Sequence, residues 1–184
     1  RRLPAIAWAV ALFAAFEGMV LTLLPIYGLQ QGFTQQQALH MASVVVIGDA
    51  ALQLPLGWLA DRLSRRLLFA ACGLGLMLSS LAIPLVLQGL ALWPLLVLFG
   101  ASAGGLFTLA LILIGEHFRD DALVRANAHV AQLWGLGCLL GPLLTGAASQ
   151  WLTGHALPLL MALGAAGFVV VVWRRPPFAQ GSQA

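Results

Sequence analysis

Two long apolar segments of this 184-residue chain are joined by the stretch Gly57-Trp58-Leu59-Ala60-Asp61-Arg62-Leu63-Ser64-Arg65-Arg66. A charged stretch between two segments of bilayer length must lie where the membrane ends. Asp61 is expected near the C-terminal end of the preceding helix, where the helix dipole disfavours a negative charge. We therefore expect this acid to be compensated by the neighbouring arginines or by the N-terminus of another helix.

The composition is that of a protein that lies almost entirely in a bilayer. Hydrophobic residues make up 61% of the chain and charged residues 8%, whereas a soluble domain has about 25% charged residues. The net charge of +3 does not predict nucleic-acid binding, because the arginines occupy short loops between apolar segments. The chain begins at Arg1, without an initiator Met, so we expect a fragment of a longer protein.

Six segments are long and apolar enough to cross a membrane, which takes about 20 residues of helix. They cover residues 3–29, 36–60, 67–87, 93–115, 123–151 and 156–173. The fold class is therefore all-α, a polytopic membrane protein with one six-helix transmembrane domain over residues 1–173. Residues 174–184 are predicted to form a disordered cytoplasmic tail.

The arginines fall in alternate connections of this six-helix pattern. They are Arg1 and Arg2, then Arg62, Arg65 and Arg66, then Arg119 and Arg125, and finally Arg174 and Arg175. The intervening loops at 30–35, 88–92 and 150–155 contain none. Because positively charged loops stay in the cytoplasm, both termini are predicted to be cytoplasmic, in the inner membrane of a bacterium.

The joining stretch resembles the loop between the second and third helices of each half of the major facilitator superfamily, Gly-x-Leu-x-Asp-Arg-x-Gly-Arg/Lys-Arg. The matching residues are Gly57, Leu59, Asp61, Arg62, Arg65 and Arg66, and Ser64 stands where the family prefers Gly. Two later patterns are also similar to the family: Gly100-x-x-x-Gly104-Gly105 with Gly115-Glu116-His117-Phe118-Arg119, and Gly137-x-x-x-Gly141-Pro142-x-x-x-Gly146. The resemblance covers about residues 3–173 and is greatest to a poorly characterised bacterial subgroup.

The resemblance implies the C-terminal six-helix half of a twelve-helix secondary transporter, built as a 3+3 inverted repeat. It implies alternating-access movement of a small molecule, driven by protons, with the N-terminal six-helix half and the lipid bilayer as partners. It also implies that the loop with Gly57, Asp61, Arg62, Arg65 and Arg66 acts as a conformational latch. No ATP-binding loop is present, so we expect neither a cofactor nor primary pumping.

Two acids lie inside predicted helices. Glu17 and Asp49 are each about 14 residues, or roughly 20 Å, from the start of their helices. A charge near the bilayer centre costs at least ~2.5–3.5 kcal/mol, so such an acid faces a protein cavity or is protonated. Tyr27 lies on the same side as Glu17, and Gln53 is one turn from Asp49. We expect these residues to couple protons or to bind a lipophilic cation; the alternative is a neutral acid hydrogen-bonded to a neighbouring helix.

The spaced glycines allow two interpretations. Gly100 with Gly104, and Gly137 with Gly141, are four residues apart, which allows close approach of two helices. The pair Gly141-Pro142 could instead bend its helix during gating. The histidines lack the spacing of a metal site, so no metal is predicted.

Three interpretations other than transport follow from parts of the sequence. Gly100-Ala101-Ser102-Ala103-Gly104 fits Gly-x-Ser-x-Gly, but a hydrolase elbow needs a preceding strand. A rhomboid-like intramembrane serine protease would pair Ser102 with His155, yet His155 is expected at the membrane surface, and the arginine-rich loop would have no role. The third possibility is a stand-alone six-helix protein that forms a homodimer. We expect a transporter and no enzyme.

Overall fold

The computed structural model describes residues 3–152 and 154–174, and in these residues all regular secondary structure is helical. The seven helices are α1 (Leu3–Thr22), α2 (Leu24–Gln30), α3 (Gln35–Arg62), α4 (Arg65–Val86), α5 (Leu92–His117), α6 (Asp120–Ser149) and α7 (Ala156–Arg174). The all-α prediction is confirmed. From residue 175 onward, the predicted tail lies outside the described residues.

Five of the described helices, namely α1, α4, α5, α6 and α7, are long and apolar enough to cross a membrane. Helix α3 has 28 residues and is therefore long enough, at about 42 Å. It is less apolar than the others because it carries glutamines at its start and Asp49 and Gln53 farther along. Five of the six predicted spans thus correspond to helices that are long and apolar enough to cross a membrane. The remaining one, α3, is long enough but more polar.

The first predicted segment is not one continuous helix. Helix α1 ends at Thr22 and α2 begins at Leu24, with Pro25 in its first turn. Proline has no backbone N–H and so cannot continue the hydrogen-bond ladder of the preceding turn. The predicted segment over residues 3–29 is therefore helical except for a turn at Leu23, whose N–H still donates to the Met19 carbonyl oxygen.

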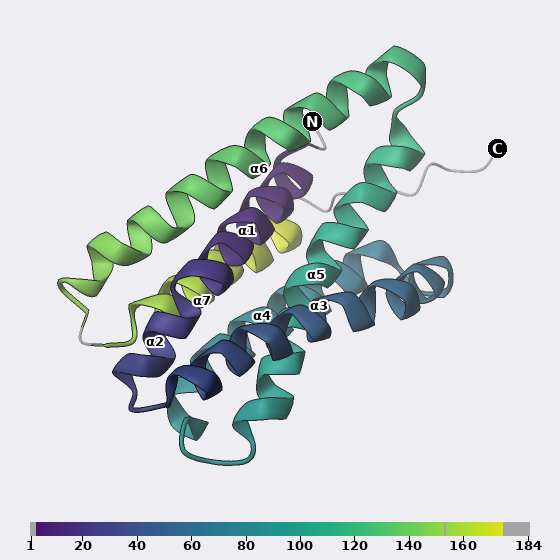
Figure 1. The fold of residues 1–184 in the computed structure, drawn as a ribbon. Helices are drawn as coiled ribbons and strands as arrows, with labels where there is room; N and C mark the ends of the chain where they lie inside the picture. Colours follow the sequence, from purple (N-terminus) through teal and green to yellow (C-terminus); the bar gives the residue numbers. More distant parts are fainter. Residues whose placement is uncertain (1–2, 153, 175–184) are drawn as a thin grey trace.

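Helix α5 is the centre of the bundle. It packs against α3, α4 and α1, while α1 packs along α6 and α4 along α7 (Figure 1). Large side chains on these faces are fully buried, among them Phe69, Phe99 and Phe168. The rings of Phe69 on α4 and Phe168 on α7 lie 5.7 Å apart, centroid to centroid. Among the five candidate spans α5 is the most buried and α6 the least, with 67% and 17% of their apolar windows inside the protein.

Two helix crossings depend on glycine. Where α1 meets α6, a Cβ on Gly137 would lie 2.6 Å from the Ala14 Cβ, and a Cβ on Gly141 would lie 2.8 Å from the Ala15 Cα. Where α3 meets α5, a Cβ on Gly100 would lie 2.9 Å from the Val45 carbonyl carbon. The backbones therefore approach too closely at both crossings for any larger residue.

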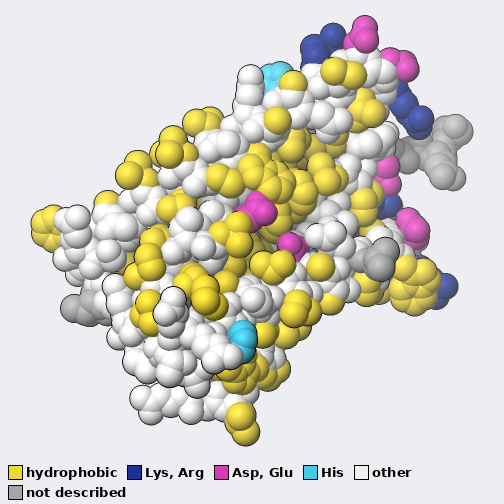
Figure 2. Space-filling model, viewed as in Figure 1, with side chains coloured by type: hydrophobic (Ala, Val, Ile, Leu, Met, Phe, Trp, Pro, Cys, Tyr) yellow, Lys and Arg dark blue, Asp and Glu magenta, His cyan; other side chains and the backbone are white. Residues whose placement is uncertain are grey.

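The turns are divided between the two ends of the bundle. The α3–α4 and α5–α6 turns lie toward one end and the α2–α3 and α6–α7 turns toward the other (Figure 1). Basic side chains gather at the end that carries the α3–α4 turn (Figure 2). The described arginines of the predicted alternate loops thus lie at one end of the bundle.

Candidate functional site

Glu17 of α1 and Asp49 of α3 line the same cavity, which has a volume of about 140 Å³. Its remaining wall is apolar and aromatic, with Phe13, Phe16, Val20 and Val45 among the lining residues. Acidic side chains surrounded by hydrophobic ones are visible in the middle of the face shown in Figure 2, well away from the charged end. The structure therefore brings together the two intrahelical acids that the sequence placed at equal depth.

Glu17 is half-buried, and its Oε2 atom is enclosed without a hydrogen-bond partner among the described residues. A buried carboxylate oxygen that makes no hydrogen bond costs free energy when the group is charged. Glu17 can be relieved of this cost by taking up a proton or by contact with a cation in the cavity. The predicted alternative, a neutral acid hydrogen-bonded to a neighbouring helix, does not account for Oε2 in this conformation.

Asp49 is held from two sides. The Gln53 side-chain amide, one turn farther along α3, donates to Asp49 Oδ1 across 3.4 Å. On the other side its carboxyl group lies against Gly104 of α5, where an added Cβ would come within 2.8 Å of Asp49 Cγ. Gly104, which the sequence singled out for helix packing, therefore also leaves the space that the Asp49 carboxyl group occupies.

Aromatic rings continue from the cavity wall into the helix bundle. Phe13 stacks on Phe107 at 4.7 Å between centroids and meets Trp134 of α6 edge-on at 5.6 Å. Phe16 meets Phe99 of α5 edge-on at 4.9 Å. These contacts join α1 to α5 and α6 beside Glu17. The sequence contains no local signal for these contacts, because they join residues on three different helices.

Tyr27 is not among the residues that line this cavity. It lies on α2, and its hydroxyl is hydrogen-bonded to His155 Nδ1 at 3.1 Å. Nearby, the Gln31 side chain donates to the Gly154 carbonyl oxygen across 3.2 Å. Tyr27 therefore ties α2 to the turn between α6 and α7, and His155 makes its contact with Tyr27 at that end of the bundle.

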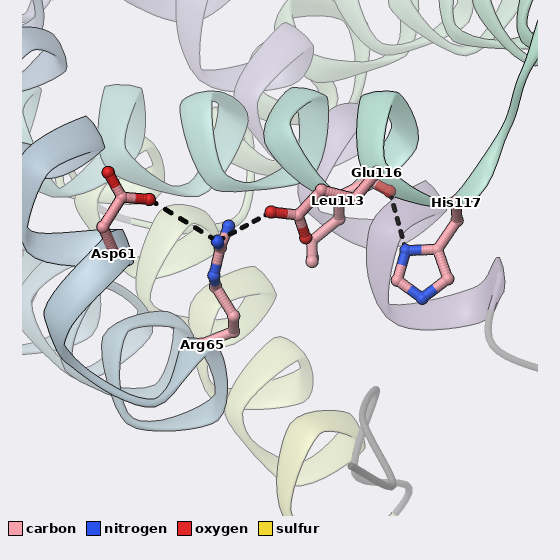
Figure 3. Close-up of polar contacts among 5 residues, drawn as sticks. All are labelled: Asp61, Arg65, Leu113, Glu116 and His117. Carbon is pink, nitrogen blue, oxygen red and sulfur yellow. Dashed lines mark hydrogen bonds and ion pairs between the residues drawn. The ribbon is translucent and has the colours of Figure 1, made fainter. Parts of the chain in front are cut away.

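The arginine-rich loop forms a charged network with the end of α5. Arg65, the first residue of α4, contacts Glu116 Oε1 at 2.7 Å and Asp61 Oδ1 at 3.9 Å (Figure 3). In the turn beside Glu116, His117 Nδ1 donates to the Leu113 carbonyl oxygen across 2.9 Å. Sequence reasoning did not identify Glu116 as a partner of Arg65, because the two residues are brought together only by the packing of α4 against α5.

The other residues of the loop have local roles. The Arg62 guanidinium lies over the Trp58 ring at 4.0 Å, and Arg66 donates to the Trp173 carbonyl oxygen across 3.2 Å. The Ser64 hydroxyl accepts from the Leu67 N–H across 3.4 Å, and so caps the N-terminus of α4. This cap explains the departure from glycine, because serine is among the preferred N-cap residues.

The glycines and Pro142 differ in their surroundings. A Cβ on Gly57 would meet no atom within 4 Å, so the described contacts do not require glycine there. Pro142 lies inside the continuous helix α6, and its ring faces Gly18 of α1, where an added Cβ would be 3.2 Å from Pro142 Cγ.

Among the described residues, no group of three or more His, Cys, Asp or Glu side chains could hold a metal ion.

The sequence model described as Major Facilitator Superfamily matches residues 6–184 of the chain. An uncharacterized MFS-type transporter of Yersinia enterocolitica is 28% identical over 159 residues, which are 86% of this chain and 41% of that protein. The uncharacterized MFS-type transporter YcaD of Escherichia fergusonii is 28% identical over 145 residues, or 79% of this chain and 37% of that protein. The chain thus spans about two fifths of the length of these curated relatives.

Proposed function

Since the chain belongs to the Major Facilitator Superfamily, we propose that it is the C-terminal six-helix half of a proton-coupled secondary transporter in a bacterial inner membrane. Members of this family are multi-pass membrane transporters and not enzymes. The rhomboid-like protease reading of Ser102 and His155 is therefore wrong, and the hydrogen bond of His155 to Tyr27 gives that histidine another role.

The proposal of a half-transporter is supported by the greater length of the relatives and by the pairing of the helices. The relatives are more than twice as long as the matched region. If α1 and α2 are taken together as one span, a 3+3 repeat makes α1 equivalent to α5, α3 equivalent to α6 and α4 equivalent to α7. The repeat then relates the α1–α6 pair to the α5–α3 pair, and both pairs are extensive. This is the pairing expected of a 3+3 repeat. On this account α3 is also a span, the second in chain order, and its polar residues face the transport pathway.

The observation that carries the proposed mechanism is the shared cavity of Glu17 and Asp49. Ionisable residues within membrane spans are costly and typically serve ion or proton pathways. Glu17 is the first choice as proton carrier, because its Oε2 has no partner among the described residues. Asp49 is the second choice, because Gln53 already satisfies part of its hydrogen bonding.

The proposed latch rests on the exposure of Asp61. Its side chain is 79% exposed, and its ion-pair contact with Arg65 is long, at 3.9 Å. Arg65 makes its short contact with Glu116 instead. Asp61 is therefore free to meet the N-terminal half of the transporter when the arginine-bearing end closes, and this contact would stabilise one conformation.

The exposed face of α6 also supports the alternative proposal that this chain forms a homodimer with another copy of itself. Leu136, Leu139, Leu143 and Leu144 are all more than half exposed on this helix. In a homodimer these residues would pack against a second six-helix unit. Crosslinking a cysteine at Leu143 in the full-length protein separates the two cases, because the homodimer predicts disulfide-linked dimers and the half-transporter predicts none.

The experiment that tests alternating access uses two cysteines at opposite ends of α6, in full-length protein from which Cys72 and Cys138 have been replaced by Ala. Ala126→Cys reports the arginine-bearing end and Ser149→Cys the opposite end. The proposal predicts that changing the pH shifts labelling by a polar maleimide in opposite directions at the two sites. Labelling that changes in parallel, or not at all, would contradict alternating access.

A further inference from the structure

A second cavity, of about 450 Å³, lies where α1, α5 and α6 meet near the basic end. Its wall is almost entirely apolar and includes Ile6 and Val10 of α1, Ile114 of α5 and Val130 of α6. This volume is within the range of about 300–1,000 Å³ typical of small-molecule pockets. The cavity that holds Glu17, at about 140 Å³, is too small for a whole ligand but has space for a charged group.

Both cavities open on one face of α1. At 3.6 residues per turn, Ile6, Val10, Phe13 and Glu17 fall within an arc of about 60°. Val10 and Glu17 are separated by roughly 10 Å along the helix axis. The turn between them carries Phe13, whose ring contacts Phe107 and Trp134. The face thus runs from an apolar cavity, past an aromatic cluster, to an acidic cavity.

The acidic cavity has the wrong charge for an anion. Glu17 and Asp49 both line it, and none of the described residues around it is basic. An anion would be repelled there by whichever carboxylate is ionised, whereas a cation would satisfy the enclosed Glu17 Oε2. The rings beside it add cation–π attraction, which is available only to a positively charged group.

We propose that the ligand of this face is an apolar monocation, whose positive charge lies on the side of Glu17 and Asp49 and whose hydrophobic groups extend along the aromatic cluster toward the cavity near Val10. This inference rests on the proposed function, since it names the substrate class of that transporter. The observation behind it is the alignment of the two cavities and the aromatic cluster along α1. The competing ligand is an apolar anion, because Arg125 and His129 also line the larger cavity.

The test uses two probes of the same shape and opposite charge, tetraphenylphosphonium and tetraphenylborate. Binding of each to the purified full-length transporter is measured by equilibrium dialysis. We expect saturable binding of tetraphenylphosphonium, with at least about tenfold weaker binding in Glu17→Gln and in Asp49→Asn. Asp121→Asn, which removes an exposed acid at the start of α6, is the matched control and should bind as the unaltered protein does.

A third variant, Phe13→Leu, keeps an apolar side chain at this position but removes the ring, and should weaken tetraphenylphosphonium binding several-fold. Thermal unfolding of every variant shows whether the protein is still folded. The inference is overturned if tetraphenylborate binds as tightly as tetraphenylphosphonium, if neither probe binds, or if folded Glu17→Gln and Asp49→Asn both bind the cation normally. Each of these results leaves the pH-dependent labelling of Ala126→Cys and Ser149→Cys intact, so the substrate class can fail while alternating access stands.

Discussion

The Arg65 guanidinium contacts the Glu116 carboxylate at 2.7 Å and thereby joins the first turn of α4 to the last turn of α5. The Arg65 side chain is only 20% exposed, and Glu116 is 46% exposed. Asp61, although four residues before Arg65 in the sequence, lies farther away at 3.9 Å and is 79% exposed. The stabilising ion pair of this loop is therefore the one between α4 and α5, and Asp61 remains accessible to a partner.

The two contacts of Arg65 should differ in their free energies. A double-mutant cycle with Arg65→Gln and Glu116→Gln is expected to give a coupling energy of about 1 kcal/mol, because the pair is short and partly buried. The same cycle with Asp61→Asn should give no more than about 0.5 kcal/mol, because this contact is long and Asp61 is exposed. The measurement is reversible unfolding of the full-length protein in detergent. Equal couplings in the two cycles would contradict this assignment.

Asp61→Asn should change the conformational equilibrium more than it changes folding. If Asp61 closes the arginine-bearing end against the N-terminal half, its neutralisation favours the state that is open at this end. Ala126→Cys, in the cavity between α1, α5 and α6, should then be labelled several-fold faster by a polar maleimide, with little loss of inserted protein. Unchanged labelling would show that Asp61 serves topology or folding only.

Gly104→Ala should be strongly harmful, and Gly135→Ala should not be. At Gly104 the added methyl group would meet the Asp49 carboxyl group, and overpacking of this kind typically costs about 1–3 kcal/mol. At Gly135 of α6 the methyl group would meet no atom within 4 Å, so the change should be neutral or stabilise the helix by up to about 1 kcal/mol. Thermal unfolding and expression level measure both effects.

The predicted topology can be tested with reporter fusions. Alkaline phosphatase, which is active only in the periplasm, should be inactive when fused after Arg174 and active when fused after Gln31, which lies in the turn between α2 and α3. The physical reason is that loops rich in arginine stay in the cytoplasm. The reverse activities would show that the arginine-bearing end faces the periplasm.

The helix boundaries were predictable because the chain consists of long apolar segments separated by short charged or polar turns. Helix α4, for example, spans Arg65–Val86, and the prediction was 67–87. The break at Leu23 was not predicted, because a proline near the end of an apolar segment is also compatible with a single helix that ends there. Tyr27 lies on α2, about 15 Å along the axis from Glu17, where it contacts His155 and does not line the cavity of Glu17.

The candidate site was predictable only in part. Glu17 and Asp49 stood out because an acid in an apolar helix is costly, and the structure shows that they line one cavity. The partnership of Arg65 with Glu116 and the fit of Asp49 against Gly104 depend on which helices are neighbours. Such contacts between distant segments leave no local pattern in a single sequence.

The central claim, that Glu17 couples protonation to the change of access, is tested most directly by Glu17→Gln in the two-cysteine labelling experiment. The glutamine keeps the shape of the side chain but cannot ionise. We predict that the opposite pH-dependent shifts at Ala126→Cys and Ser149→Cys disappear in Glu17→Gln and persist in Asp121→Asn. Opposite shifts of undiminished size in folded, inserted Glu17→Gln would contradict the account and remove Glu17 from the coupling mechanism.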